Sequence, residues 1–335
     1  MIITKTPFRM SFFGGGTDIP DFFNEGRGAV ISTTFDKYVY VTVRHLPQFF
    51  DYKSEIIYSK MERVVDVNEI QHPMVKNAIK MLDMHELHIS YDADLPARSG
   101  LGTSSTFAVG LLNAFYCLKG KYRSKKDLAN DAIYLERELC NEAGGWQDQI
   151  AAAFGGLNRI DFKDNMYHVN PIIISPERKK QLESNLLLFF TGFTRLSSDV
   201  QAAAKKSMQD KKEQLNQMLE LVDEAQDILE NKERDLDDFG RLLDKTWRLK
   251  RQTSNQVSTN SIDEFYEKGI EAGALGGKLL GAGGGGFLLF YCTEDKQESL
   301  KQALSCLMEV PFKFENSGAR VIYYTPESYE KKKGE

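Results

Sequence analysis

Polar and hydrophobic residues alternate along several short stretches of the chain, and this period of two predicts β-strands. The clearest stretch is 36–44, where β-branched and aromatic residues occupy most positions. Residues 87–91 alternate in the same way, and residues 2–13 are expected to be extended with a break at Pro7. A continuous apolar run at 186–191 predicts a buried strand. Further strands are predicted at 55–59, 63–67, 157–162, 166–169, 287–291, 311–314 and 319–324.

Other segments carry apolar residues three and four positions apart, or caps that start a helix. Residues 73–83 have one apolar face, and residues 107–118 are small, apolar and free of proline, which favours a buried helix. Ser124 and Ser175 are expected to cap two further helices. We take the second of these helix starts, Ser-Pro-Glu, as the boundary between two domains, 1–175 and 176–335. Helices are also predicted at 199–231, 236–253, 261–272 and 293–308.

The composition narrows the class of protein. The chain has 335 residues, of which 41% are hydrophobic and 27% charged, and its net charge of −5 argues against a general nucleic-acid binder. No apolar run is long enough for a membrane span, and the N-terminus lacks a signal-peptide core. The four cysteines are widely spaced, so we expect reduced thiols and a cytoplasmic protein. His85 and His88 are expected to be surface residues rather than metal ligands.

Three stretches are rich in glycine, at 14–18, 96–105 and 281–286, and are called here the first, second and third glycine-rich loops. The second loop lies between a predicted strand and a predicted helix. There, free backbone N–H groups and the positive helix end would form an anion site. An ordinary capped loop is the alternative. The Walker pattern of P-loop NTPases does not fit, because Thr103 rather than lysine follows Gly102.

The first loop, Gly-Gly-Gly-Thr-Asp, cannot be the interior of a strand, so it either exposes its backbone to a ligand or makes a tight turn. Asp18 would accept hydrogen bonds from sugar hydroxyls or cap the following turn. The third loop matches Gly-x-Gly-x-x-Gly, but it precedes a strand, whereas the dinucleotide fingerprint must open a helix. It is either a turn between two strands or a close backbone approach to a ligand.

Two carboxylates are candidates for chemistry. Glu136 lies at the edge of the apolar stripe of its helix, although a solvated carboxylate is the simpler interpretation. Asp148 falls in the first turn of a short helix, where the dipole favours aspartate, but its small neighbours leave room for a substrate. No Gly-x-Ser-x-Gly sequence is present and the histidines are scattered. Glycine cradles suit phosphoryl transfer, in which the protein mainly positions groups and stabilises charge.

In their order and spacing, these motifs resemble the GHMP family of small-molecule kinases over nearly the whole chain. Pro7-Phe-Arg9 with the first loop is similar to the family's first motif, and residues 278–287 are similar to its third. The second loop is similar to its ATP-phosphate loop, with Thr103-Ser104 where Ser-Ser is usual. The resemblance implies an α+β fold. Its N-terminal, ATP-binding domain would be like the second domain of ribosomal protein S5, its C-terminal domain would be ferredoxin-like, and the active site would lie between them.

The resemblance also implies roles for individual residues. Asp148 would orient the anomeric hydroxyl of a sugar and accept its proton late, since aspartate is a weak base. Arg9 would stabilise the transferring phosphoryl group, and Ser104 and Glu136 would hold Mg²⁺. The ATP phosphates would contact the backbone of Ser99, Gly100, Leu101, Gly102, Thr103 and Ser104. Substrate contacts would come from Gly16, Thr17, Asp18, Gly283 and Gly284 as well as Asp148.

The first loop and the Gly-Trp-Gln-Asp-Gln stretch are most similar to the sugar-1-kinase branch of the family, and the Gly-Glu-His of galactokinases is absent. A sugar that already carries a phosphate would require a second basic site, for which Arg195, Arg248, Lys250 and Arg251 are candidates. An L-fucokinase-like or other sugar kinase and a catalytically inactive sugar or nucleotide sensor are the alternatives. Adenine contacts are expected among residues 40–79, and the sequence leaves open whether the chain forms a homo-oligomer.

Overall fold

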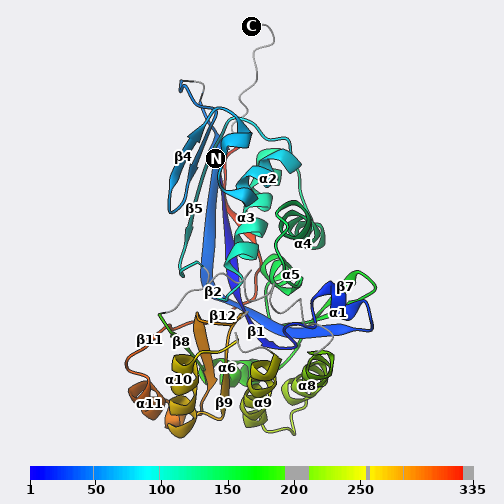
Figure 1. Ribbon diagram of the computed structural model, residues 1–335, viewed down its shortest axis with the longest axis vertical. Helices are drawn as coiled ribbons and strands as arrows, with labels where there is room; N and C mark the ends of the chain where they lie inside the picture. The colour runs from blue at the N-terminus through cyan, green and yellow to red at the C-terminus, as the bar shows by residue number, and fades with distance from the viewer. Residues whose placement is uncertain (48, 98, 193–210, 254–256, 282, 327–335) are drawn as a thin grey trace.

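The computed structural model describes residues 1–47, 49–97, 99–192, 211–253, 257–281 and 283–326. Within them lie a nine-stranded and a four-stranded β-sheet. Figure 1 shows the larger sheet above the smaller one, each with helices packed against it. This mixed architecture, with mainly antiparallel strands, agrees with the α+β fold that the motifs predict.

The larger sheet is built on two long antiparallel strands, β1 (Ile2–Phe13) and β2 (Gly28–His45). β2 begins earlier than predicted because residues 28–35 are buried without interruption and show no alternation. β1 is not broken at Pro7, where its pairing with β2 shifts register instead. The other strands are β3 (Ser54–Ile57), β4 (Met61–Val64), β5 (Leu87–Ala93), β6 (Asn158–Lys163), β7 (Met166–Pro171), β12 (Phe314–Glu315) and β13 (Arg320–Tyr324). Their order is β13-β1-β2-β5-β3-β4, with β12 and the β6–β7 pair attached to β2.

Helices cover one side of this sheet (Figure 1). They are α2 (Pro73–Met81), α3 (Thr103–Leu118), α4 (Lys125–Tyr134) and α5 (Gln147–Phe154). Two short helical elements, α1 (Pro20–Phe23) and η1 (Val67–Glu69), precede them in the chain. α3 packs on β1 and β2 and is almost entirely buried, as its small apolar residues predict. α4 runs directly into a five-residue π-helix, η2 (Leu135–Leu139).

The smaller sheet has the antiparallel order β11-β8-β10-β9, from β8 (Leu186–Phe190), β9 (Gly276–Leu279), β10 (Phe287–Tyr291) and β11 (Met308–Glu309). Its helices are α6 (Pro176–Ser184), α8 (Lys212–Glu230), α9 (Asp237–Thr253), α10 (Asn260–Glu271) and α11 (Glu294–Ala303). α11 ends before the predicted residue 308 because residues 308–309 pair with β8. Of the helix predicted at 199–231, residues 199–210 lie outside the described residues.

The last two described strands return to the larger sheet. β13 pairs with β1 and β12 pairs with β2, so the segment after residue 311 does not belong to the smaller sheet. The N–H of Thr325 also donates to the carbonyl oxygen of Met1 at 2.9 Å. The boundary at residues 175 and 176 stays a prediction, but a single cut there does not separate the two sheets.

The prediction that His85 and His88 are both surface residues is wrong for one of them. His88 lies on β5 with its side chain only 16% exposed, and its Nδ1 is 2.7 Å from Oε2 of Glu55. His85 is exposed. Among the described residues no group of three or more histidine, cysteine or acidic side chains could hold a metal ion. No helix in the described ranges is long and apolar enough to cross a membrane.

The Glu315 side chain links β12 and β13 to β2 of the larger sheet. Its Oε2 accepts hydrogen bonds from Tyr38 at 2.7 Å and Arg320 at 2.8 Å, and its Oε1 accepts one from the N–H of Ser317. Partial burial is the largest effect and raises the pKa of Glu315, but the N–H of Ser317, then Tyr38 and Arg320, outweigh it and lower the pKa to about 2. The carboxylate therefore stabilises the fold above its ordinary pKa, and this contribution is lost as the pH falls towards 2.

We expect Glu315→Gln to lower the free energy of unfolding by roughly 1–3 kcal/mol at pH 7, because the carboxylate loses charge-assisted hydrogen bonds. The deficit relative to wild type should shrink as the pH falls below 4.5. Urea titrations at several pH values measure it. Glu309→Gln is the control, since the ion pair of Glu309 with Lys301 is more exposed. A loss of unfolding free energy that does not depend on pH would contradict the stabilising role of the Glu315 carboxylate.

Candidate active site

The second and third glycine-rich loops touch backbone to backbone. A Cβ on Gly100, whose φ is +80°, would lie 2.4 Å from the carbonyl oxygen of Leu280, and one on Gly281 would lie 2.3 Å from the Cα of Gly100. A Cβ on Gly286 would lie 2.1 Å from the carbonyl oxygen of Ser99. Any side chain at these points would push the loops apart. The third loop joins β9 to β10, so it is a turn between two strands, one of the two alternatives, and its approach to a ligand stays a prediction.

The second loop opens directly into α3, with Gly102 as the N-cap residue and no side chain capping the first turn. The hydroxyl oxygens of Ser99 and Thr103 are buried without a hydrogen-bond partner. Buried polar groups are almost always hydrogen-bonded, so two such hydroxyls at one helix start are unusual. Because the N–H groups and the helix dipole favour an anion at this point, the loop has the geometry of an anion site.

Arg9 on β1 and Asp148 in the first turn of α5 form a bidentate ion pair beside this loop. Nε of Arg9 lies 2.7 Å from Oδ1 of Asp148 and Nη2 lies 2.8 Å from Oδ2. Nη1 of Arg9 donates to the carbonyl oxygen of Gly100 at 2.9 Å. Oδ2 of Asp148 is also close to the start of α3, since a Cβ on Gly102 would lie 3.2 Å from it. The pair is therefore held at the phosphate end of the candidate nucleotide site.

Asp18 lies buried near this pair, and it bonds the start of α5 rather than capping the turn that follows it. Its Oδ1 accepts from the N–H of Gly16 at 2.9 Å, and its Oδ2 accepts from the N–H of Gln147, the first residue of α5, at 3.2 Å. Burial, and then the charge of Asp148, raise the pKa of Asp18, while the backbone hydrogen bonds oppose this rise. Two carboxylates thus lie within electrostatic reach of each other.

The expected substrate contact of Thr17 does not agree with its burial. Its hydroxyl is inaccessible to solvent and lies 2.8 Å from the carbonyl oxygens of both Gly14 and Ala29. The hydroxyl also accepts a hydrogen bond from the N–H of Ala29 at 3.1 Å. The Thr17 hydroxyl therefore fixes the first loop against β2, and the substrate role of Thr17 stays a prediction.

Glu136 is buried, with 1% of its surface exposed, so the solvated interpretation is wrong. It lies in η2, and a π-helical turn changes which side chains face inward, which a regular helical pattern does not predict. Nε2 of Gln149 donates to Oε2 of Glu136. Glu142 lies close by: burial and then the charge of Glu136 raise its pKa, while a hydrogen bond from Ser104 lowers it. The sequence analysis missed Glu142, which lies in an irregular segment.

Two lysines from the second half of the chain reach the same region. The ammonium of Lys250, on α9, donates to the carbonyl oxygen of Gly281. Removal from water, and then the charge of Arg9, lower the pKa of Lys250 to about 8, although Asp18 acts in the opposite direction. Of the three described residues considered for a second phosphate, Lys250 is thus the one near Arg9 and Asp18.

Lys278 was not selected from the sequence. It lies on β9, is 3% exposed and donates to the carbonyl oxygens of Ser11 at 2.9 Å and Phe12 at 2.7 Å. Burial, followed by the charges of Lys250 and Arg9, lowers its pKa well below the ordinary value. A lysine between glycines and leucines in an otherwise apolar strand was the signal that could have found it.

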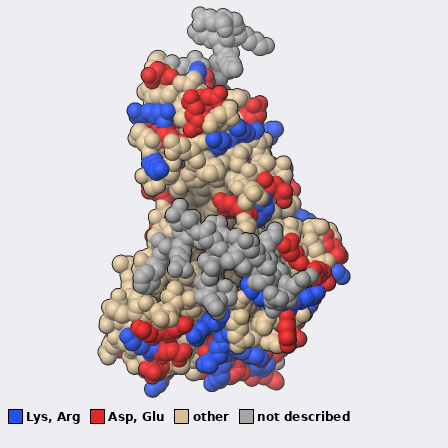
Figure 2. All heavy atoms as spheres, viewed as in Figure 1, with Lys and Arg blue, Asp and Glu red and all other residues tan. Residues whose placement is uncertain are grey.

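The two other described candidates, Arg248 and Arg251, form ion pairs with carboxylates outside the site. Arg248 is exposed and pairs with Asp244 at 2.7 Å, and Arg251 pairs with Asp263 at 3.0 Å. Such pairs contribute to the intermingled acidic and basic surface of the lower half of the molecule (Figure 2). Arg195 lies outside the described residues.

Gly283 and Gly284 pack against the segment that follows α9. A Cβ on Gly283 would lie 2.7 Å from the Cα of Val257, and the N–H of Gly284 donates to the carbonyl oxygen of Val257 at 3.1 Å. This backbone contact accounts for both glycines without a ligand, so their substrate role stays a prediction.

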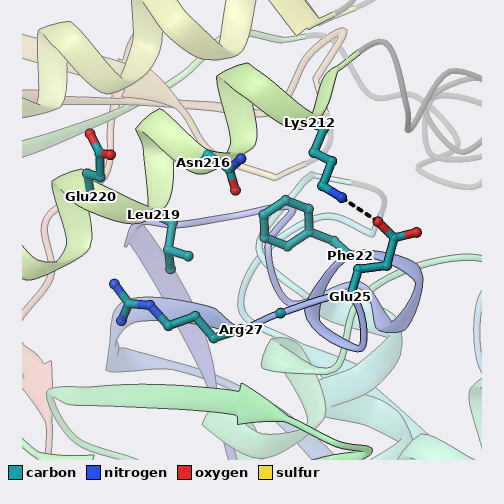
Figure 3. Close-up of a pocket in the computed structure, with 8 residues that line it drawn as sticks. Phe22, Glu25, Arg27, Lys212, Asn216, Leu219 and Glu220 are labelled. Carbon is teal, nitrogen blue, oxygen red and sulfur yellow. Dashed lines mark hydrogen bonds and ion pairs between the residues drawn. The ribbon is translucent and has the colours of Figure 1, made fainter.

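A cavity of about 420 Å³ lies between α8 and the segment that follows α1 (Figure 3). It is lined by Phe22, Glu25, Gly26, Arg27, Lys212, Asn216, Leu219 and Glu220. Lys212 pairs with Glu25 at 2.6 Å, and Arg27 pairs with Asp223 at 2.7 Å. Because both cations already face carboxylates, this cavity is poorly suited to a phosphate.

Glycine loops in contact, a helix start and a part-buried Arg–Asp pair form the kind of site that enzymes use for phosphoryl transfer. Residues 72–156 match the model of the GHMP kinases N terminal domain, and residues 218–310 match that of the GHMP kinases C terminal domain. The chain belongs to the GHMP kinase family.

Relatives of known activity extend this result. The chain is 32% identical over 320 residues to D-glycero-alpha-D-manno-heptose 7-phosphate kinase of Campylobacter jejuni, covering 90% of this chain and 93% of the relative. It is 26% identical to the bifunctional fucokinase/GDP-fucose pyrophosphorylase of Arabidopsis thaliana, covering 90% of this chain but 31% of that protein. The crystal structure of a D-glycero-D-manno-heptose 1-phosphate kinase from Bacteroides thetaiotaomicron has the same fold. Its TM-score is 0.78 at 24% identity, over 96% of this chain and 99% of that one.

We expect Gly100→Ala to lower ATP affinity more than tenfold, because its Cβ would separate the second and third loops and add left-handed strain. Gly120→Ala is the matched control. Its φ of +66° imposes similar strain, roughly 1–2 kcal/mol, but a Cβ there has open space. Nucleotide titration with urea denaturation measures both effects. Equal ATP affinity in the two variants would show that the loop contact does not shape the site.

Proposed function

We propose that this protein is an ATP-dependent sugar kinase that phosphorylates the anomeric (C1) hydroxyl of D-glycero-α-D-manno-heptose 7-phosphate, giving the 1,7-bisphosphate. The observation that carries the proposal is the bidentate Arg9–Asp148 pair beside the start of α3. The Campylobacter relative supports the choice of sugar. The product would feed nucleotide-activated heptose synthesis for surface polysaccharide. The four free cysteines are consistent with a cytoplasmic enzyme.

ATP would bind with its phosphates on the second loop. The backbone N–H groups from Ser99 to Ser104 and the uncapped first turn of α3 supply donors for anionic oxygens. The unpartnered hydroxyls of Ser99 and Thr103 would gain acceptors when the phosphates enter. Donors without a protein partner are expected where a protein binds an anion.

Asp148 would orient the anomeric hydroxyl and take its proton as the bond to phosphorus forms. Arg9 would hold Asp148 in place and stabilise charge on the phosphoryl group. A guanidinium has five N–H donors, and the bonds to Asp148 and to the carbonyl of Gly100 use three. Two donors therefore remain for phosphate oxygens.

The carboxylates at the start of α3 suit Mg²⁺, which prefers hard oxygen ligands. We propose that the Ser104 hydroxyl and the Glu136 carboxylate hold it, and Glu142 is hydrogen-bonded to the same hydroxyl. When bound, Mg²⁺ would neutralise charge on the ATP phosphates. Gln149 would keep the Glu136 side chain directed towards the ion.

On the sugar side, Asp18 is the proposed ligand of hydroxyl groups. Each of its oxygens accepts one backbone hydrogen bond and retains capacity for another. Gly16 would contribute its position in the first loop rather than a side chain. We keep Lys250 as a phosphate-binding residue, and which phosphate it meets is considered below.

An L-fucokinase-like activity is the second candidate, and the Arabidopsis relative is the observation that favours it. A catalytically inactive sensor of the same fold is the third. A sensor has no need for the part-buried Arg9–Asp148 pair together with the buried carboxylate of Glu136.

The test is an ADP-release assay with ATP and Mg²⁺ against mannoheptose 7-phosphate, mannose 6-phosphate, fucose, galactose and mevalonate. We expect turnover of the heptose phosphate and a loss of roughly 10²–10⁴-fold in Asp148→Asn, because the proton acceptor is removed. Asp295→Asn, at an exposed position, is the control. Turnover of fucose alone would favour the second candidate, and nucleotide binding without any turnover would favour the sensor.

For the metal site, we expect Glu136→Gln to weaken Mn²⁺ binding in the presence of ADP at least tenfold, because the ion loses a charged oxygen ligand. Electron paramagnetic resonance of Mn²⁺ measures this without turnover. Glu138→Gln removes an equal charge from an exposed position of the same π-helix and should leave binding unchanged. Equal loss in both variants would move the metal site elsewhere.

A further inference from the structure

Three cations and two carboxylates meet where the glycine-rich loops converge. Arg9 is neutralised by Asp148 through two hydrogen bonds. Asp18 is the other carboxylate of the cluster, and its oxygens are engaged by backbone N–H groups. Lys250 and Lys278 are the remaining cations, and each feels the charge of Arg9. The described groups of this cluster are therefore three basic side chains and two acidic ones.

Neither lysine is neutralised locally. Among the described residues, the hydrogen-bond acceptors of both ammonium groups are backbone carbonyl oxygens: that of Gly281 for Lys250, and those of Ser11 and Phe12 for Lys278. Carbonyls satisfy the donors but carry no net charge, so the cost of removing these cations from water is only partly recovered. An anion bound in the cluster would offset the remaining cost of desolvation.

The position of Lys250 indicates which anion this is. Its ammonium is attached to the carbonyl of Gly281, and Gly281 is packed directly on Gly100. The carbonyl of Gly100 in turn accepts from Arg9. Lys250 and Arg9 thus each donate to a carbonyl of the same backbone contact. Lys278 holds the end of β1, from which the first loop departs, and so positions that loop against β9.

We propose that Lys250 is a catalytic residue that contacts the γ-phosphoryl group of ATP together with Arg9, and that Lys278 is a positioning residue for this cluster. The inference rests on the proposed function in taking ATP as the donor. In a heptose 7-phosphate the existing phosphate lies at the far end of the sugar from the C1 hydroxyl. A cation beside Arg9 is therefore at the transferring group, and the sugar's own phosphate must be bound elsewhere.

The experiment compares equilibrium binding of ADP and adenylyl imidodiphosphate, a non-hydrolysable ATP analogue, by calorimetry. We expect Lys250→Met to weaken the analogue roughly 10- to 100-fold and ADP less than about twofold, because only the analogue carries the group that the ammonium contacts. Lys250→Arg should retain most of the preference for the analogue, since it keeps the charge. Lys278→Met should weaken the analogue by a smaller factor, as expected of an indirect role.

Arg248→Gln is the matched control, because Arg248 lies on the same helix in an exposed ion pair and should change neither affinity. Thermal unfolding establishes that each variant is folded. Equal weakening of ADP and the analogue by Lys250→Met would overturn the proposal, since general damage acts on both. Unchanged analogue binding with weakened heptose 7-phosphate binding would also overturn it and assign Lys250 to the sugar's phosphate.

The binding measurements with ADP and the ATP analogue need no sugar, so they test the role of Lys250 independently of the proposed substrate. If wild type fails to phosphorylate the heptose while Lys250→Met still loses the preference for the analogue, the substrate is wrong and the role of Lys250 stands. If wild type phosphorylates the heptose and Lys250→Met keeps the preference for the analogue, the substrate is right and the proposed role of Lys250 is wrong.

Discussion

Direct contact between Gly100 and Gly281 joins the two halves of the chain at the candidate active site. Arg9 is bonded to the carbonyl of the first glycine and Lys250 to that of the second, so the contact sets the distance between the two cations. No side chain can intervene without moving both loops. The spacing of charges in the site is therefore controlled by backbone, which is stiffer than the long side chains it carries.

This arrangement brings like charges together. Asp18 and Asp148 repel each other, and Lys278 is buried while Lys250 is partly buried, both near the charge of Arg9. Buried charges of this kind persist only where the surrounding fold is stable enough to hold them. Here that fold includes α3, which is almost entirely buried against β1 and β2. A phosphorylated ligand would relieve the strain, so binding and stability are coupled.

Local pattern was enough to predict α3, most strands and the three glycine-rich loops, because these depend on neighbours in sequence. Local pattern failed to predict contacts between residues that are far apart in the sequence. Asp18 caps a helix that starts 129 residues later in the chain, and no local signal reveals this bond. Glu136 is turned inward by a π-helical turn, which breaks the period on which helix prediction depends. Lys278 donates to the carbonyls of Ser11 and Phe12, which are distant in the sequence, so its role depends on the folded structure.

The pairing of β13 with β1 has a consequence for biosynthesis. Translation produces β1 first, and residues 320–324 leave the ribosome more than 300 positions later. During that interval one edge of β1 has no strand beside it in the nascent chain, and such open edges attract other chains. The register shift near Pro7 lies on the same strand and interrupts its regular hydrogen bonding. Chaperones that shield unpaired edges would then matter most before the final segment is released.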